Sequence, residues 1–223
     1  MSAAVSKGSL IMHARNVFGG AALACLLAGV AHAESNGEIL KFSVTRDGTQ
    51  IGTNTIDVVR KGGETNVQVV THVEVGLAFI TLYRYDQTET ERWNNGHLIS
   101  LSSVTDDNGT VHRTSASPCE GGLLVQGDGG AQKLAPTVVP ASIWNPEMLS
   151  QNVVLNPVDG KLVAVSVVDR GEDALSIDGR TERAHHYMVK TVYSEDLWYD
   201  DAHRLVKMEL KGSDGSTIRY QLT

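Results

Sequence analysis

Polar and apolar residues alternate along much of the chain. In the segment 65–75 most odd positions are valine and the even positions are mainly polar, and the segments 205–211 and 217–222 alternate in the same way. Successive side chains of a β-strand point to opposite faces, so this period of two predicts strands that bury one face each. Helical spacing is scarce, and only residues 141–150, around Trp144, suggest a short turn or helix.

Turn dipeptides separate the strand-like segments. Asp-Gly or Asn-Gly pairs begin at positions 47, 95, 108, 128, 159, 178 and 214. Both dipeptides tolerate the positive φ angles of tight hairpins, so they predict an antiparallel arrangement. All five prolines lie between positions 118 and 157, where we expect the regular sheet to be interrupted because proline cannot donate to a central ladder.

These patterns together predict an all-β fold, an antiparallel meander curled into a barrel or half-barrel. Two blocks of strands are expected, at about 38–116 and 158–223. An irregular crossover at about 117–157 joins them and packs over a sheet or plugs a barrel mouth. Curling is favoured because closure of a sheet removes its exposed edges.

Residues 1–33 have the pattern of a signal peptide. Lys7 and Arg15 supply a short basic region, an apolar run follows at 17–30, and the tripeptide Ala-His-Ala ends at Ala33. A small-x-small tripeptide is typical of a signal-peptidase site, so cleavage is expected after Ala33 and the mature protein is expected in the periplasm. No later apolar run approaches the ~20 residues of a membrane helix, and no transmembrane segment is predicted in the mature chain.

The mature chain, 34–223, is predicted to be a single β-barrel-like domain. An alternative is lipidation at Cys25, but the apolar run continues past this residue, whereas acylated cysteines follow the run. If residues 1–33 are removed, Cys119 is the sole thiol that remains, so no intramolecular disulfide is predicted.

Composition narrows the function. The chain has 223 residues, of which 41% are hydrophobic and 20% charged, which suits a domain with an ordinary core. Its formal charge is −7, and removal of the first 33 residues takes away two basic side chains and no acidic one. Phosphate recognition needs a concentrated basic surface, so no nucleic-acid partner is predicted. Nothing in the sequence sets an oligomeric state.

No catalytic motif is present. The chain lacks a Gly-x-Ser-x-Gly elbow, a phosphate-binding loop, a His-Glu-x-x-His helix and a dinucleotide fingerprint, so no catalytic residue and no cofactor are predicted. His185 and His186 are neighbours in a strand-like segment and should point to opposite faces. They cannot easily share one ion, and no metal site is predicted.

The segment 77–93 is the most informative about function. Its odd positions carry four aromatic residues and two acids, all on one face of a continuous strand. These side chains either fill the core and reach the barrel mouth, or line a cavity with apolar walls and a few polar anchors, the usual composition of a small-molecule site. The candidate ligand-binding residues are Phe79, Tyr83, Tyr85, Glu91, Trp93, Trp144 and Trp198.

Several short motifs resemble a known family. They are 49–52 after an Asp-Gly turn, Tyr83-x-Tyr85 followed by Glu91-x-Trp93, 105–109, Ser142-Ile143-Trp144-Asn145, and 197–200 with Leu205-Val206-Lys207. In these residues the chain resembles a family of uncharacterised exported bacterial proteins that is classed as a domain of unknown function. It is also distantly similar to lipoprotein-carrier half-barrels. The resemblance implies an antiparallel barrel or half-barrel in the periplasm and supplies no catalytic residues.

Three functional hypotheses follow. The leading one is a periplasmic binding protein that holds a small apolar or amphipathic molecule, such as a lipid moiety. The second is a structural or protein-interaction module of the cell envelope with a filled core and no ligand, whose partner is an envelope protein. The third and weakest is a hydrolase, which requires carboxylates or histidines that converge in one cleft.

Overall fold

One antiparallel sheet of 13 strands dominates the computed structural model, which describes residues 35–77, 80–177 and 179–223. Its first block comprises β1 (Asn36–Arg46), β2 (Thr49–Lys61), β3 (Glu64–Leu77), β4 (Ile80–Asn94), β5 (His97–Asp107), β6 (Thr110–Cys119), β7 (Gly122–Gly127) and β8 (Gly130–Leu134). Its second block comprises β11 (Ser166–Ile177), β12 (Arg180–Lys190), β13 (Ser194–Tyr199), β14 (Leu205–Lys211) and β15 (Thr217–Leu222). The all-β prediction is confirmed.

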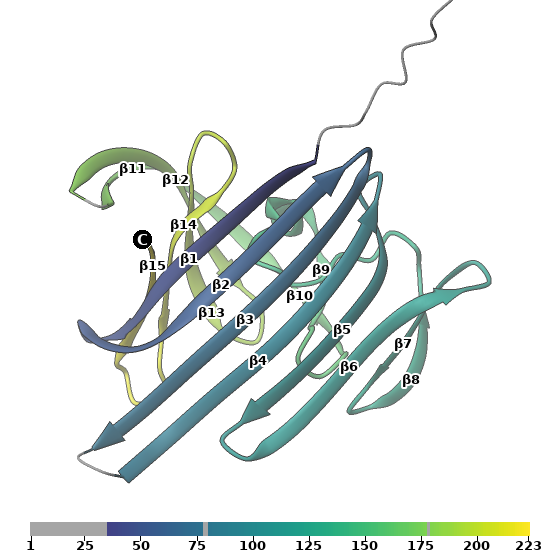
Figure 1. Ribbon diagram of the computed structural model, residues 1–223, viewed down its shortest axis with the longest axis horizontal. Coiled ribbons are helices and arrows are strands. Elements are labelled where there is room, and N and C mark those ends of the chain that lie inside the picture. The colour runs from purple at the N-terminus through teal and green to yellow at the C-terminus, as the bar shows by residue number, and fades with distance from the viewer. Residues whose placement is uncertain (1–34, 78–79, 178) are drawn as a thin grey trace, which may run out of the picture. The chain divides into compact units, whose positions relative to one another are not determined.

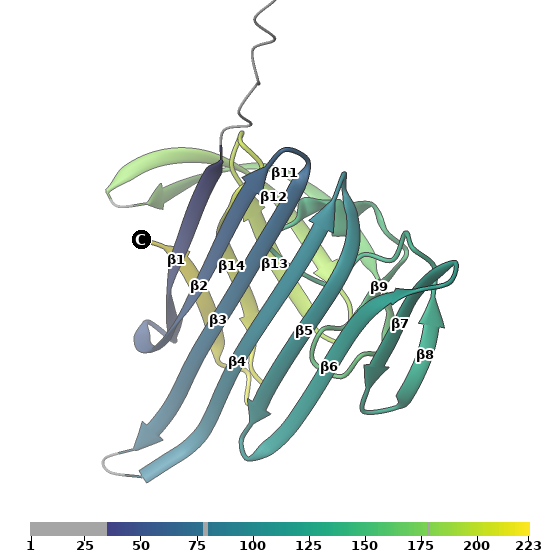
Figure 2. The same cartoon turned by 45° about the vertical axis from the view of Figure 1, so that its right-hand side comes forward.

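The strand order is β11-β12-β13-β14-β15-β1-β2-β3-β4-β5-β6-β7-β8. Every neighbouring pair except β1 and β15 is consecutive in the chain, so the sheet consists of two meanders joined at that pair. The sheet curls but does not close, and β8 and β11 are its two edges, so it forms an open half-barrel (Figures 1 and 2).

The hairpin turns form where the dipeptides predict them. Asp47, Asn95 and Asn108 have φ angles of 49°, 49° and 50°, and the glycine after each also has a positive φ. Two successive residues with positive φ define the turn whose twist matches that of antiparallel strands. These dipeptides therefore set the register of the pairs β1–β2, β4–β5 and β5–β6.

The irregular crossover begins later than the sequence suggests, at residue 135 instead of about 117, and extends to 165. Regular pairing continues through Pro118, which lies next to the end of β6 and removes a single backbone donor there. The crossover contains the short 3-10 helix η1 (Pro146–Ser150) and a small two-stranded sheet of β9 (Val153–Leu155) and β10 (Leu162–Ala164). The helix falls within the expected range, and the Asn145 side chain caps it by accepting a hydrogen bond from the Glu147 amide.

The crossover packs inside the curl of the large sheet. Its side chains Val139, Met148, Val154 and Leu155 are at most 4% exposed and belong to the main hydrophobic cluster. The sheet contributes to the same cluster from both of its blocks: Leu40, Phe42, Ile56, Val58, Val67, Trp93, Leu98, Leu101, Ala116, Leu123, Val125, Val189, Leu197, Tyr199, Leu205 and Met208. We call the sheet face that carries these residues the inner face. In both views β9 lies between the two walls of the sheet (Figures 1 and 2).

The opposite face of the sheet carries a second, smaller cluster. It consists of Ile177, Ala184, Trp198 and Val206 on β11 to β14. Within the described ranges, no helix is long and apolar enough to cross a membrane.

Candidate functional site

A row of polar side chains crosses the inner face of the sheet. Asn54 on β2 lies opposite Thr71 on β3, Thr71 lies opposite Gln87 on β4, and Gln87 lies opposite Thr105 on β5. Because register aligns these residues and alternation directs them to one face, the four side chains form a continuous polar belt. Asn54, Thr71 and Thr105 are buried, and Gln87 is partly buried.

Hydrogen bonds satisfy part of this polar belt. Asn54 Nδ2 donates to Thr71 Oγ1 at 2.8 Å, and Gln87 Oε1 accepts from the Tyr85 hydroxyl at 3.3 Å. Asn54 Oδ1 and Thr105 Oγ1 have no partner among the described residues, although these side chains belong to residues only 3% and 0% exposed. A buried polar atom without a partner costs about 1–3 kcal/mol, so the belt offers two acceptors that another molecule can satisfy.

Next to the belt, β4 carries a buried pair of carboxyl groups. Glu89 and Glu91 are 4% and 1% exposed, and they share the inner face because they are two residues apart on one strand. Gln87 Nε2 donates to Glu89 Oε2 at 3.2 Å, which links the pair to the belt.

Glu91 accepts hydrogen bonds from three side chains. Its Oε2 accepts from Trp93 Nε1 at 2.7 Å and from Trp144 Nε1 at 3.0 Å, and its Oε1 accepts from the Ser142 hydroxyl. The two indole rings meet edge to face, with centroids 5.8 Å apart and an interplanar angle of 85°. Ser142 and Trp144 belong to the crossover, so Glu91 fixes this segment against the sheet.

The surroundings of Glu89 favour its protonated form. Burial and the neighbouring Glu91 carboxyl raise the pKa of Glu89 well above its ordinary value. Donors favour the charged form of the group that accepts them, and Glu91 has more of them than Glu89. The proton of the pair therefore lies on Glu89.

The facing wall of the curl also carries ionisable groups. Burial raises the pKa of Glu195 on β13, and no basic group contributes to the shift. Burial and the nearby Glu195 raise the pKa of Tyr220 on β15 to about 12. Burial and Tyr220 raise the pKa of Tyr85 on β4. By register, Tyr220 and Tyr85 lie in one row of the inner face that runs through Val44, Gly52 and Val73.

The structure brings together three of the residues that the sequence singles out. Glu91, Trp93 and Trp144 form the hydrogen-bonded cluster described above. Tyr83 and Tyr85 lie further along the same face of β4, and Tyr83 is 37% exposed. Phe79 lies outside the described residues.

Trp198 does not join this group, because its side chain is on the opposite face of the sheet. Its ring stacks on His186, with centroids 4.3 Å apart, and the Lys207 amine lies 4.0 Å from its centroid. Its Nε1 donates to Asp173 Oδ2 at 2.8 Å. As expected, His186 and His185 have separate partners: Asp173 and Asp196 for the first, and Asp169 for the second.

Sequence reasoning missed the polar belt and the facing acid. Asn54, Thr71 and Glu195 are polar residues at inner positions of strands that otherwise bury apolar side chains, and Thr105 shares its strand with a second buried polar residue, Ser103. Each interrupts the alternation of its own strand, and this was the available signal. Only the register shows that the four residues of the belt are neighbours.

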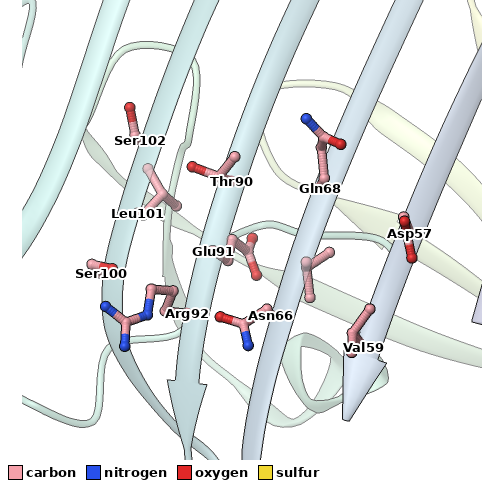
Figure 3. A pocket seen from close by; sticks show the side chains of 11 residues that line it. Asp57, Val59, Asn66, Gln68, Thr90, Glu91, Arg92, Ser100, Leu101 and Ser102 are labelled. Carbon is pink, nitrogen blue, oxygen red and sulfur yellow. The ribbon is translucent and has the colours of Figure 1, made fainter. Parts of the chain in front are cut away.

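A separate hollow of about 410 Å³ lies on the outer face of β2 to β5. Figure 3 shows side chains around it that alternate with the inner ones, among them Asp57, Asn66 and Arg92. A smaller hollow of about 200 Å³ lies between η1, β12 and the turn after β13, beside His185 and His203. Over the described ranges, no group of three or more His, Cys, Asp or Glu side chains is placed to hold a metal ion.

The protein belongs to the all-β class, and its open antiparallel sheet encloses the crossover and buries a polar belt. The chain belongs to the family described as Domain of unknown function (DUF6134), which it matches over residues 42–223. This match confirms the expected membership in a family of unknown function, while the likeness to lipoprotein-carrier half-barrels stays a prediction. No curated protein matches the sequence.

Proposed function

We propose that this protein is exported to the periplasm and binds a small amphipathic molecule against the inner face of its sheet. The observation that carries the proposal is the pair of buried atoms without partners, Asn54 Oδ1 and Thr105 Oγ1. Buried polar groups are almost always hydrogen-bonded in native proteins, and two in one row favour a ligand or ordered water at that place. Export rests on the signal-peptide pattern of residues 1–33.

The surroundings of the belt suit the apolar part of such a ligand. The next row of the inner face carries Val44, Gly52, Val73 and Tyr85, and Tyr220 lies opposite Val44. Small-molecule sites combine apolar and aromatic walls with a few polar groups that fix orientation. The belt supplies the polar groups and these rows supply the walls.

The first experiment is native mass spectrometry of protein purified from the periplasm of an expressing host. We expect a mass excess that disappears on denaturation, and saturable binding of an apolar fluorescent dye by the stripped protein. Absence of both the mass excess and the dye binding would refute the proposal.

The second experiment locates the site with Thr105→Val, which removes the unpartnered hydroxyl and keeps the shape of the side chain. The variant should be more stable than the wild type by about 1 kcal/mol when empty, because it no longer buries an unsatisfied group. It should also bind the copurifying molecule more weakly. The control is Thr90→Val, at an exposed outer position of the adjacent strand, which should leave binding unchanged.

The alternative is a structural or interaction module, and the buried crossover favours it. Val154 and Leu155 are 0% exposed, so part of the interior is filled by the chain itself. On this reading Thr105→Val changes stability alone, and crosslinking in intact cells should recover a specific envelope protein.

A further inference from the structure

The polar belt and the row on either side of it hold acceptors without any fixed cation. The rows run Gly52-Val73-Tyr85-Asp107, Asn54-Thr71-Gln87-Thr105 and Ile56-Val69-Glu89-Ser103 across β2 to β5. None of these positions is Lys or Arg. The nearest imidazole, of His112 opposite Thr105, is paired with Asp128.

The facing wall adds to this excess of acceptors. Glu195 lies two residues from Leu197 on the same face, opposite Leu210 and Val189, and no cation pairs with it among the described residues. Arg46, at the end of β1, is already paired with Asp214. Within the described part of the chain, the interior therefore holds the carboxyls of Glu89 and Glu195 with no basic side chain free to balance them.

We infer that the ligand has a cationic head that donates hydrogen bonds, such as a primary ammonium, on an apolar tail. This inference rests on the proposed function and names the chemistry of the molecule bound there. An ammonium provides donors for Asn54 Oδ1 and Thr105 Oγ1, neither of which has a partner. Its charge would pair with Glu89 and Glu195 and favour their ionised forms, whereas the carboxylate of a fatty acid would find no basic side chain to pair with in this poorly solvated interior.

The apolar tail is expected along the row that contains Val73 and Tyr85. Tyr220 extends this row beyond β1, since it lies opposite Val44. The head then lies at the belt, and the tail extends toward the half-exposed Tyr83.

The experiment compares three amphiphiles of equal chain length by titration calorimetry on the stripped full-length mature protein, below their micelle concentrations. They are dodecylammonium, dodecyltrimethylammonium and dodecanoate. Dodecylammonium should bind at least about tenfold more tightly than dodecanoate, the difference expected for one charge-assisted hydrogen bond. It should also bind more tightly than the trimethyl form, which carries the charge but has no donor.

Two variants assign the preference to the named residues. Glu195→Gln keeps the shape of the side chain and should weaken dodecylammonium binding about tenfold. Thr105→Val should weaken it as well, which keeps the test decisive if the first variant does not fold. The matched control is Glu209→Gln, on β14 and paired with Lys207 and Arg219, which should leave binding unchanged.

The outcomes separate the inference from the proposed function. Equal or tighter binding of dodecanoate would overturn the cationic head and leave a binding protein. Equal binding of the two ammonium forms would overturn the hydrogen-bond donation. If none of the three amphiphiles binds, the proposed function and the inference both fail.

Discussion

Substitution of Glu91 should destabilise the protein far more than substitution of its neighbour Glu89. Glu91 is 1% exposed and accepts from two indoles and a hydroxyl, so water cannot replace a lost acceptor. Glu91→Leu leaves the N–H groups of Trp93 and Trp144 buried without a partner. At about 1–3 kcal/mol for each group, the free energy of unfolding should fall by about 4 kcal/mol.

Glutamine at the two positions gives a sharper comparison, because it keeps the shape and removes the charge. Glu91→Gln turns charge-assisted hydrogen bonds into neutral ones and should cost about 2 kcal/mol. Glu89→Gln replaces a side chain that is already protonated, and it removes the repulsion within the pair. At pH 7 this variant should be no less stable than the wild type, because the folded wild type holds a proton that its unfolded chain has released.

The assay is urea unfolding of the four proteins at pH 7, followed by circular dichroism and by tryptophan fluorescence. With a slope of about 2–3 kcal/mol/M, Glu91→Leu should lower the midpoint by roughly 1.5 M. Equal destabilisation by the two glutamine variants would refute the assignment of the proton to Glu89.

Three further predictions test other parts of the argument. Because burial raises the pKa of Glu89 above its ordinary 4.5, the folded protein keeps a proton that the unfolded chain has released. The free energy of unfolding should therefore fall as pH rises above about 4.5, by at most about 1.4 kcal/mol per pH unit for this group. In urea titrations over pH 5–8, Glu89→Gln should become progressively more stable than the wild type. Parallel pH curves for the two proteins would contradict this. Gly52→Ala should lower the free energy of unfolding by at least about 3 kcal/mol, because the added Cβ would lie 2.0 Å from the His72 carbonyl oxygen. Gly37→Ala is the control and should be tolerated, because its Cβ would have nothing within 4 Å. Trp198→Phe should lower stability by about 1 kcal/mol without changing ligand binding, since this ring is on the outer face; lost binding would argue against an inner site.

The sequence predicts the strands and turns well because both depend on local chemistry. The Asp-Gly and Asn-Gly turns mark hairpins, and the inner residues Val67, Thr71 and Val73 of β3 follow the period of two that the sequence displays. The crossover begins later than the proline-rich interval predicts, because one proline near a strand end does not stop the pairing. At Pro118, next to the end of a strand, pairing needs one donor fewer and continues.

The candidate site was predicted in part. Glu91 and Trp93 are two residues apart on one strand, so alternation alone places them together. Trp144 joins them through a fold contact that local pattern does not encode, and Trp198 leaves the group because a strand position one residue off reverses the face. The belt depends on the alignment of four strands, which one strand's pattern cannot reveal.

The pairing of β1 with β15 has a consequence for how the chain folds. Every other pair in the large sheet joins consecutive strands, whereas the contact between Thr223 and Lys41 spans 182 residues. The entropy of loop closure grows with the length of chain enclosed, so this seam is the least favourable pair to nucleate. The two meanders can form independently as local hairpins, and the seam then joins them around the crossover. Linking the C-terminus to β1 and cutting the crossover would convert the sheet into one uninterrupted meander. Such a circular permutant should fold faster than the natural order, because the slow closure becomes a hairpin.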